Sequence, residues 1–112
     1  MSISNNQLKC CSAGDGIIKI YSLSGELLKT YGTRGRGDRY QLECPFISDD
    51  DGSVLIADYY NDRLQVMSEK GKFSVLQLHS FVSCPRSAVL FNNNLYVTQV
   101  SYRNNKVYKF SC

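Results

Sequence analysis

Short apolar runs alternate with polar turns along this chain, and the pattern is clearest between residues 44 and 71. Residues 46–47, 54–57 and 64–66 are apolar or alternate with the period of a strand. Clustered acids before Gly52, the polar residues 58–62 and the turn at Gly71 separate these runs. Strands this short, joined by turns this tight, predict an antiparallel meander. Such a sheet cannot bury both of its faces alone, so we expect neighbouring copies.

The sequence contains two such copies. Residues 6–25 align without a gap on residues 52–71, at an offset of about 46 residues, which places Gly25 on Gly71. A third copy begins at Cys84-Pro85, which matches Cys44-Pro45, and has roughly two extra residues in its turn at 101–103. The repeats predict about ten strands, as three, four and three. They also predict these positions to be mostly buried: Leu8, Cys10, Ile18, Ile20, Val54, Ile56, Leu64, Val66, Leu95, Val97 and Val107.

Residues 32–78 resemble an NHL repeat, the blade unit of a β-propeller. The residues that carry the resemblance are Pro45, the Asp51-Gly52 turn, Ile56, Ala57, Asp58, Asn61, Arg63, Gln65, Val66 and Gly71. At the Asp58, Asn61 and Arg63 positions, the first copy has Ser12, Asp15 and Ile17. The third copy has Gln99, Asn104 or Asn105, and Lys106.

The resemblance implies an all-β fold: a single partial β-propeller built from four-stranded antiparallel blades. Residues 1–32 would be an incomplete first blade, 33–78 a complete repeat and 79–112 an incomplete third blade. Because propellers commonly have four to eight blades, we expect a fragment of a longer protein or a short gene-model product. We interpret Asp58, Asn61 and Arg63 as a structural turn, in which Arg63 reaches across to the other two.

Strand direction sorts the turns onto two faces, because successive turns of a meander lie at opposite ends of its strands. The turn at 59–62, the turn at 101–105 and the linkers 33–40 and 79–85 share one face, and every arginine, Arg86 included, lies on or beside it. Guanidinium groups pair with phosphates or carboxylates, and tyrosine rings stack on bases or anchor in a partner. The predicted binding face, for protein or single-stranded RNA, comprises Arg34, Arg36, Arg39, Tyr40, Tyr59, Tyr60, Arg63, Tyr102 and Arg103.

Composition bears on whether the chain is ordered and on where in the cell it is located. The chain has 112 residues and a formal net charge of +3, a mild excess that does not argue for disorder. Its five cysteines are odd in number and lack paired spacing, which favours reduced thiols over a disulfide framework or a zinc site. The polar start lacks the apolar core of a signal peptide. We therefore predict a cytoplasmic protein without a membrane segment.

The sequence offers few candidate catalytic or metal-binding residues. His79 is the only histidine, and no pattern places a nucleophile beside a base. The tripeptide Arg36-Gly37-Asp38 is read by integrins, but short motifs match often by chance and the cysteine usage disfavours an extracellular role. We therefore predict no metal, no cofactor and no enzymatic activity.

The favoured interpretation is a non-catalytic interaction module. The NHL resemblance suggests the C-terminal propeller of a tripartite-motif protein, whose longer parent would then be a RING-type ubiquitin ligase. The alternatives are a fragment of a propeller enzyme of the amidating-lyase type, or a purely structural repeat segment. We also expect self-association through open strand edges near residues 8–10 and 107–110.

Overall fold

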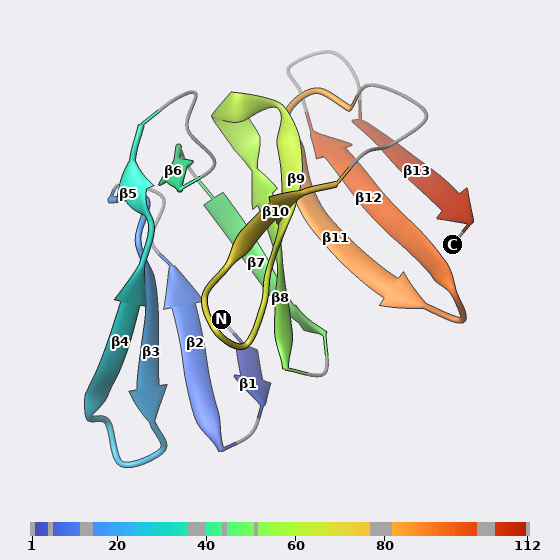
Figure 1. Ribbon diagram of the computed structural model, residues 1–112. Coiled ribbons are helices and arrows are strands. Elements are labelled where there is room, and N and C mark those ends of the chain that lie inside the picture. Colours follow the sequence, from blue (N-terminus) through green and yellow to red (C-terminus); the bar gives the residue numbers. More distant parts are fainter. Residues whose placement is uncertain are drawn as a thin grey trace.

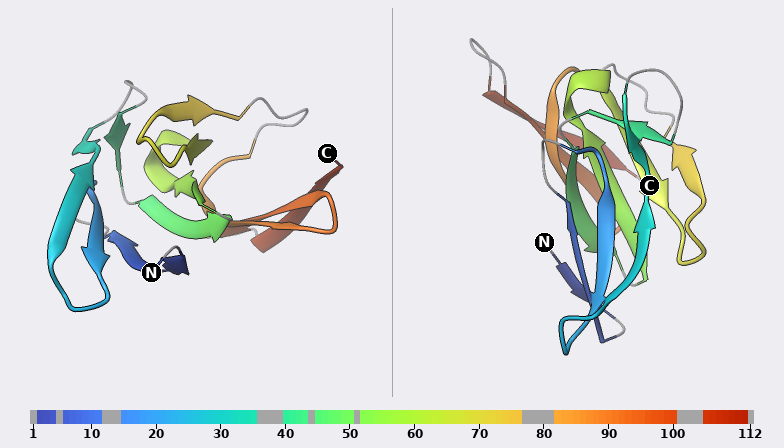
Figure 2. Two further views of the ribbon diagram at one scale, coloured as in Figure 1. Left: turned by 60° about the horizontal axis from the view of Figure 1, so that its bottom comes forward. Right: turned by 90° about the vertical axis from the view of Figure 1, so that its left-hand side faces the viewer.

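The computed structural model describes residues 2–4, 6–11, 15–35, 40–43, 45–50, 52–76, 82–100 and 105–111. Within these residues it is an all-β segment of three antiparallel sheets that follow one another in an arc (Figures 1 and 2). This confirms the predicted fold class. The one helix of the described part is η1 (Tyr59–Asn61), a single 3-10 turn. No helix among these residues has the length and apolarity to cross a membrane.

The sheets are built from strands in chain order. The first sheet has the order β1-β2-β3-β4, with β1 (Ser2–Ser4), β2 (Gln7–Cys11), β3 (Ile18–Ser22) and β4 (Leu27–Tyr31). The second has the order β10-β9-β8-β7, with β7 (Pro45–Asp50), β8 (Ser53–Asp58), β9 (Arg63–Met67) and β10 (Phe73–Val75). The third has the order β11-β12-β13, with β11 (Pro85–Phe91), β12 (Asn94–Val100) and β13 (Asn105–Ser111). Between the first two sheets, β5 (Thr33–Arg34) and β6 (Gln41–Leu42) form a short parallel pair.

The first strand of each sheet lies on the inner side of the arc, where β7 contacts both β1 and β11. Turns then alternate between two ends of the sheets, as strand direction requires. In Figure 1 the β8–β9 connection and the β5–β6 pair lie at the upper end, and the β3–β4, β7–β8 and β9–β10 hairpins lie at the lower end. We use "upper end" and "lower end" in this sense below.

The repeat is visible in the hydrogen bonds of two hairpins. In the β3–β4 hairpin the Gly25 N–H donates to the Ser22 carbonyl at 3.0 Å, and in the β9–β10 hairpin Gly71 donates to Ser68 at 2.9 Å. In both hairpins the serine hydroxyl accepts from the N–H four residues further on, at 3.1 Å. Both glycines have positive φ, +93° and +86°, which L side chains rarely adopt. The two segments therefore share one backbone design.

Two apolar clusters fill the spaces between sheets. The cluster at the first boundary, between the first and second sheets, contains Ile18, Ile20, Leu42, Val54, Ile56, Met67 and Phe73. The cluster at the second boundary, between the second and third sheets, contains Leu55, Ala57, Leu64, Val82, Ala88, Leu95 and Val97. Alternate residues of β8 thus contribute to opposite clusters, which is why that strand is apolar on both faces.

Four of the eleven predicted core positions are corrected. Leu8, Cys10 and Val66 are only half-buried, and Val107 is 69% exposed. Leu8 and Cys10 point away from the second sheet, and Val107 lies on the face of the third sheet that no other described sheet covers. Lys9, which lies between Leu8 and Cys10 in β2, points toward the second sheet instead and is 3% exposed.

The strand count also differs from the sequence-based prediction. The first sheet has four strands, because the polar start contributes β1, which pairs with β2. Residues 8–10 therefore have a strand on each side and form no open edge. Within the described residues β13 has a single pairing partner, β12, so the expected edge near residues 107–110 is present. The division of the chain at residues 32 and 78 stays a prediction.

Candidate functional site

The β8–β9 connection at the upper end organises the candidate site. It consists of η1 and Asp62, which has the left-handed conformation φ 52°, ψ 42°. Aspartate tolerates this region better than most residues because its short side chain can hydrogen-bond locally. The side chain does so here: Asp62 Oδ1 accepts the Cys84 N–H at 2.8 Å. The connection is therefore tied to the segment that leads into the third sheet.

Asp58, at the end of β8, is fully buried and holds the connection from inside. One carboxylate oxygen accepts hydrogen bonds from Asn61 Nδ2 at 2.8 Å and Arg63 Nε at 3.0 Å. The other oxygen accepts the Glu43 N–H at 2.8 Å. Arg63 also donates from Nη2 to the Gln41 carbonyl at 2.6 Å. We call Asp58, Asn61 and Arg63 the turn brace.

The turn brace also fixes the linker between the first two sheets. Asn61 Nδ2 lies 3.1 Å from the Gly35 carbonyl, in addition to the bonds that Asp58 and Arg63 make to residues 41–43. A buried ion pair is retained only where hydrogen bonds satisfy the remaining polar atoms, and the backbone groups of this linker supply them. The Arg63 side chain is 15% exposed and its guanidinium is bound to the protein, so it contributes little positive charge to a ligand.

Beside the turn brace, three aromatic rings and one guanidinium form a continuous group. The rings of Tyr59 and Tyr60 meet edge to face at 4.9 Å, and those of Tyr59 and Phe46 at 6.2 Å. Arg86 Cζ lies 5.1 Å from the centroid of the Phe46 ring, within the range of a cation–π contact. We call Phe46, Tyr59, Tyr60 and Arg86 the aromatic–arginine cluster.

Tyr59 anchors this cluster across the second boundary. Its hydroxyl donates to the Val100 carbonyl at 3.0 Å, which links the second sheet to β12. Burial raises the pKa of the Tyr59 phenol, and the neighbouring Cys84 raises it further, while Arg86 acts in the opposite direction. The phenol therefore stays protonated at neutral pH and keeps its donor role, with its ring held in one orientation.

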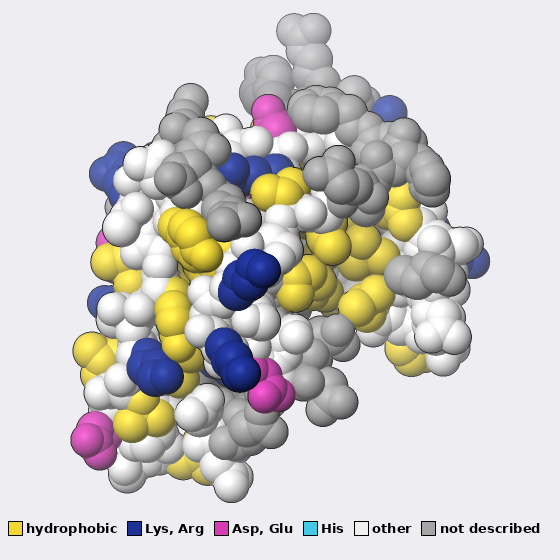
Figure 3. Space-filling model, in the orientation of Figure 1, with side chains coloured by type: hydrophobic (Ala, Val, Ile, Leu, Met, Phe, Trp, Pro, Cys, Tyr) yellow, Lys and Arg dark blue, Asp and Glu magenta, His cyan; other side chains and the backbone are white. Residues whose placement is uncertain are grey.

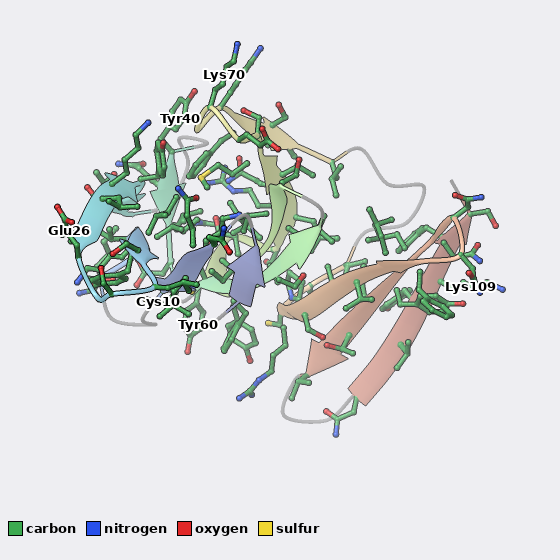
Figure 4. All side chains as sticks on the ribbon, turned by 90° about the horizontal axis from the view of Figure 1, so that it is seen from below. Cys10, Glu26, Tyr40, Tyr60, Lys70 and Lys109 are labelled. Atoms are coloured by element: carbon green, nitrogen blue, oxygen red, sulfur yellow. The ribbon has the colours of Figure 1, made fainter. Side chains whose placement is uncertain are left out.

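The exposed part of the cluster is Tyr60 and Arg86. Tyr60 is 52% exposed and Arg86 is exposed. Phe46 and Arg86 are the second residues of β7 and β11, the inner strands of two adjacent sheets. Figure 4 shows Tyr60 projecting on the opposite side of the molecule from Tyr40 and Lys70. The cluster thus presents a ring and a cation at the inner side of the arc, at the upper end.

The structure divides the predicted binding face. Tyr59, Tyr60 and Arg63 lie together around the β8–β9 connection. Arg34 is 66% exposed and pairs with Glu43 at 3.4 Å, and Tyr40 packs against Phe73 at 5.0 Å between ring centroids. Tyr40 lies on the opposite side of the molecule from Tyr60 (Figure 4). Arg34 stays linked to the β8–β9 connection through its partner, because the Glu43 carbonyl accepts the Tyr60 N–H at 3.2 Å. The other predicted members lie outside the described residues: Arg36, Arg39, Tyr102 and Arg103. Binding of protein or single-stranded RNA stays a prediction.

Sequence reasoning missed Phe46 and Arg86 as site residues, although a signal was present. Cys84-Pro85 matches Cys44-Pro45, so the residue after each proline occupies the same position in two repeats. An aromatic residue in one repeat and an arginine in the next can meet where two inner strands are adjacent. The described residues contain no group of three histidine, cysteine or acidic side chains placed to hold a metal ion. His79 lies outside them.

Comparison with known proteins supports the fold. No family model and no curated protein sequence matches the chain. Two similar solved structures are a streptogramin B lyase and the virginiamycin B lyase of Staphylococcus aureus. Each superposes with a TM-score of 0.63 at 15% sequence identity over 99% of this chain. The chain spans 39% and 40% of the length of these lyases.

These similarities show a β-propeller fold and leave the NHL and tripartite-motif assignments as predictions. They also correct the expectation that the chain has no part in catalysis, because both structural neighbours are enzymes. That expectation rested on the single histidine and on the lack of a pattern that places a nucleophile beside a base. A propeller can take its functional residues from loops of several sheets, so the composition of one segment is a poor guide to activity.

Proposed function

We propose that this chain is a segment of a propeller lyase and that its aromatic–arginine cluster contributes to substrate binding. The observation that carries the proposal is the exposed ring and guanidinium at the inner side of the arc, on a fold whose solved counterparts are lyases. Aromatic side chains beside a few fixed polar groups are the usual lining of a small-molecule site.

The cluster offers two kinds of contact to a substrate. The exposed Tyr60 ring, braced edge to face by Tyr59, provides a flat surface for an apolar or aromatic group. The Arg86 guanidinium remains exposed above Phe46 and can donate to a carbonyl or carboxylate of the substrate. Tyr59 and Phe46 act as positioning residues, since their own polar and apolar groups are engaged within the protein.

A lyase breaks a bond by elimination, so its products do not gain the mass of a water molecule. The names of the structural neighbours make streptogramin B compounds the first substrates to test. We expect the protein to bind virginiamycin B and, where the segment contains the catalytic groups, to convert it without addition of water. Mass spectrometry of the reaction mixture distinguishes elimination from hydrolysis.

Variants of the cluster test the site. Tyr60→Ala and Arg86→Gln should each weaken binding by about tenfold, which corresponds to about 1.4 kcal/mol. Tyr96→Ala, on the third sheet outside the cluster, is the matched control and should bind like wild type. Titration by calorimetry gives the affinities. Wild-type protein that shows neither binding nor turnover of virginiamycin B would contradict the proposal.

A further inference from the structure

A second surface lies at the lower end of the first boundary, where hairpins of the first and second sheets meet (Figure 1). Two adjacent hollows of about 230 Å³ and about 350 Å³ occupy it. They share Gln7, Ile20 and Glu69, and so form one continuous groove, which we call the hairpin groove. The smaller hollow also contacts Lys9, Gly52, Met67 and Ser68, and the larger one Leu28, Lys29 and Tyr31.

Lys9 departs from the repeat at this groove. Lys9 pairs with Ile20 as Leu55 pairs with Val66, so the two residues hold equivalent positions in the first and second sheets. Leu55 is a buried member of the second apolar cluster. Placing an ammonium group at 3% exposure in that position costs free energy. Such local departures from a consistent pattern are typical of functional sites.

Charges of both signs line the hairpin groove. Lys9, Ile20 and Lys29 form one row across β2, β3 and β4, so all three face the second sheet. The smaller hollow combines Lys9 with Glu69, and the larger one combines Lys29 with Glu69. In Figure 3, basic and acidic side chains lie close together beside hydrophobic ones over the lower part of the visible face. This arrangement suits a ligand that carries both charges.

The position of Glu69 depends on a glycine. A Cβ atom at Gly52 would collide with the Glu69 carboxylate, and Gly52 has φ +94°. Gly52 therefore leaves the space in which this carboxylate lies beside the groove. Apolar side chains form part of the wall around the charges, beside the polar Gln7 and Ser68, and they comprise Ile20, Leu28, Met67 and the ring of Tyr31.

We propose that the hairpin groove binds a free α-amino acid with an apolar side chain. The ligand carboxylate accepts from Lys9, whose ammonium has three donors and can serve a ligand in addition to a contact within the protein. The ligand ammonium donates to Glu69. The ligand side chain extends into the larger hollow, against Leu28 and the Tyr31 ring. This site lies at the other end of the sheets from the aromatic–arginine cluster and is independent of lyase activity.

Calorimetric titration with L-leucine tests the proposal. Isocaproate keeps the carboxylate and the side chain of leucine but has no ammonium, and isopentylamine keeps the ammonium but has no carboxylate. L-leucine should bind at least about tenfold more tightly than either analogue, because each analogue can make only one of the two charged contacts in the groove. Equal affinity for all three compounds, or no binding of L-leucine, would overturn the proposal.

Two variants and one control identify the groove. Lys9→Met keeps the length of the side chain without its charge and should weaken L-leucine binding by about tenfold or more. Glu69→Gln should do the same, and because Glu69 is exposed, this variant keeps the test valid if Lys9→Met fails to fold. Lys109→Met removes a lysine from the distant β13 (Figure 4) and should leave binding unchanged. Wild-type affinity in the Glu69→Gln variant would refute the assignment, whatever the virginiamycin B experiment shows.

Discussion

Both boundaries lie between antiparallel sheets, but different side chains fill them. At the second boundary, Leu55, Ala57 and Leu64 of the second sheet pack against Ala88, Leu95 and Val97 of the third. At the first boundary, apolar packing by residues such as Ile18 and Ile56 gives way to Lys9 and the hairpin groove at the lower end. The repeat therefore determines which positions face each other across a boundary. The residue type at a single position, such as Lys9 in place of a leucine, determines whether that part of the boundary is an apolar core or a groove.

The linkers at the two boundaries also differ, in the bonds that hold them to the β8–β9 connection. The linker before the second sheet is bound by the buried Asp58 carboxylate through Glu43, and by Arg63 through Gln41. The linker before the third sheet is bound to the β8–β9 connection by the bond from Cys84 to Asp62. The first linker depends on a buried ion pair, which is costly to break, whereas the second depends on a half-buried hydrogen bond.

Replacement of Asp58 should have the largest effect. Asp58→Ala leaves the Arg63 guanidinium buried without its counter-ion, and the loss of unfolding free energy should be about 3–5 kcal/mol. Asp62→Ala, the equivalent test at the other linker, should lose about 1–2 kcal/mol. Urea denaturation measures both. Equal losses would mean that the two linkers are held with the same strength and would remove this part of the comparison.

The equivalent positions 9 and 55 give the next largest effect. Leu55→Ala should lower the unfolding free energy by about 3 kcal/mol, because it opens a cavity in the second cluster. Lys9→Leu should lower it by less, because leucine fills this position as Leu55 does in the second sheet, and the loss comes from the contact that Lys9 makes within the protein. Urea denaturation of both variants measures these changes in unfolding free energy. A large loss in Lys9→Leu would show that Lys9 is part of the structural core.

The reactivity of the Cys11 thiol should show the smallest effect. It tests whether reagents reach the first boundary above the hairpin groove. Burial raises the pKa of the Cys11 thiol, whose Sγ donates to the Pro45 carbonyl at 3.2 Å. The folded protein therefore holds this proton more tightly than the unfolded chain. Iodoacetamide should modify Cys11 more slowly in the folded protein than in urea, as mass spectrometry of peptides would show.

The sign of the pH dependence follows from the same shift. A raised thiol pKa contributes stability below the unfolded-state value, and this contribution is lost as the pH rises through the folded-state value. Cys11 should therefore stabilise the fold at neutral pH and lose that contribution only under alkaline conditions. Rapid modification of Cys11 at neutral pH would indicate that the first boundary is open along its whole length.

The fold could be predicted well from the sequence because aligning the repeats shows which turn and strand residues are equivalent. The offset that places Gly25 on Gly71 also places Ser22 on Ser68, and the two hairpins show the same hydrogen bonds. Gln99 follows the same logic: it lies at 8% exposure in the third sheet, where the second sheet has Asp58. Local turn chemistry and strand period were sufficient for these features.

Other features depend on neighbours that no local pattern reveals. Strand period marks two faces of β2 and does not say which one meets another sheet, so Leu8 and Cys10 were predicted to be buried, whereas Lys9 is the residue that faces the second sheet. Likewise, Arg86 contacts Phe46 only because β7 and β11 lie side by side. Both contacts join residues far apart in the sequence, and only the arrangement of sheets brings them together.

Gly71 has a consequence for the angle between the first and second sheets. A Cβ atom at this residue would collide with the Tyr31 ring, so the bare α-carbon sets how closely β4 and the β9–β10 hairpin approach. Both lie at the outer rim, away from the inner strands. A side chain there would act as a wedge that spreads the rim while the inner strands stay in contact. The angle between these two sheets would then increase, and a propeller with such a wedge at every boundary would need fewer blades to complete a circle.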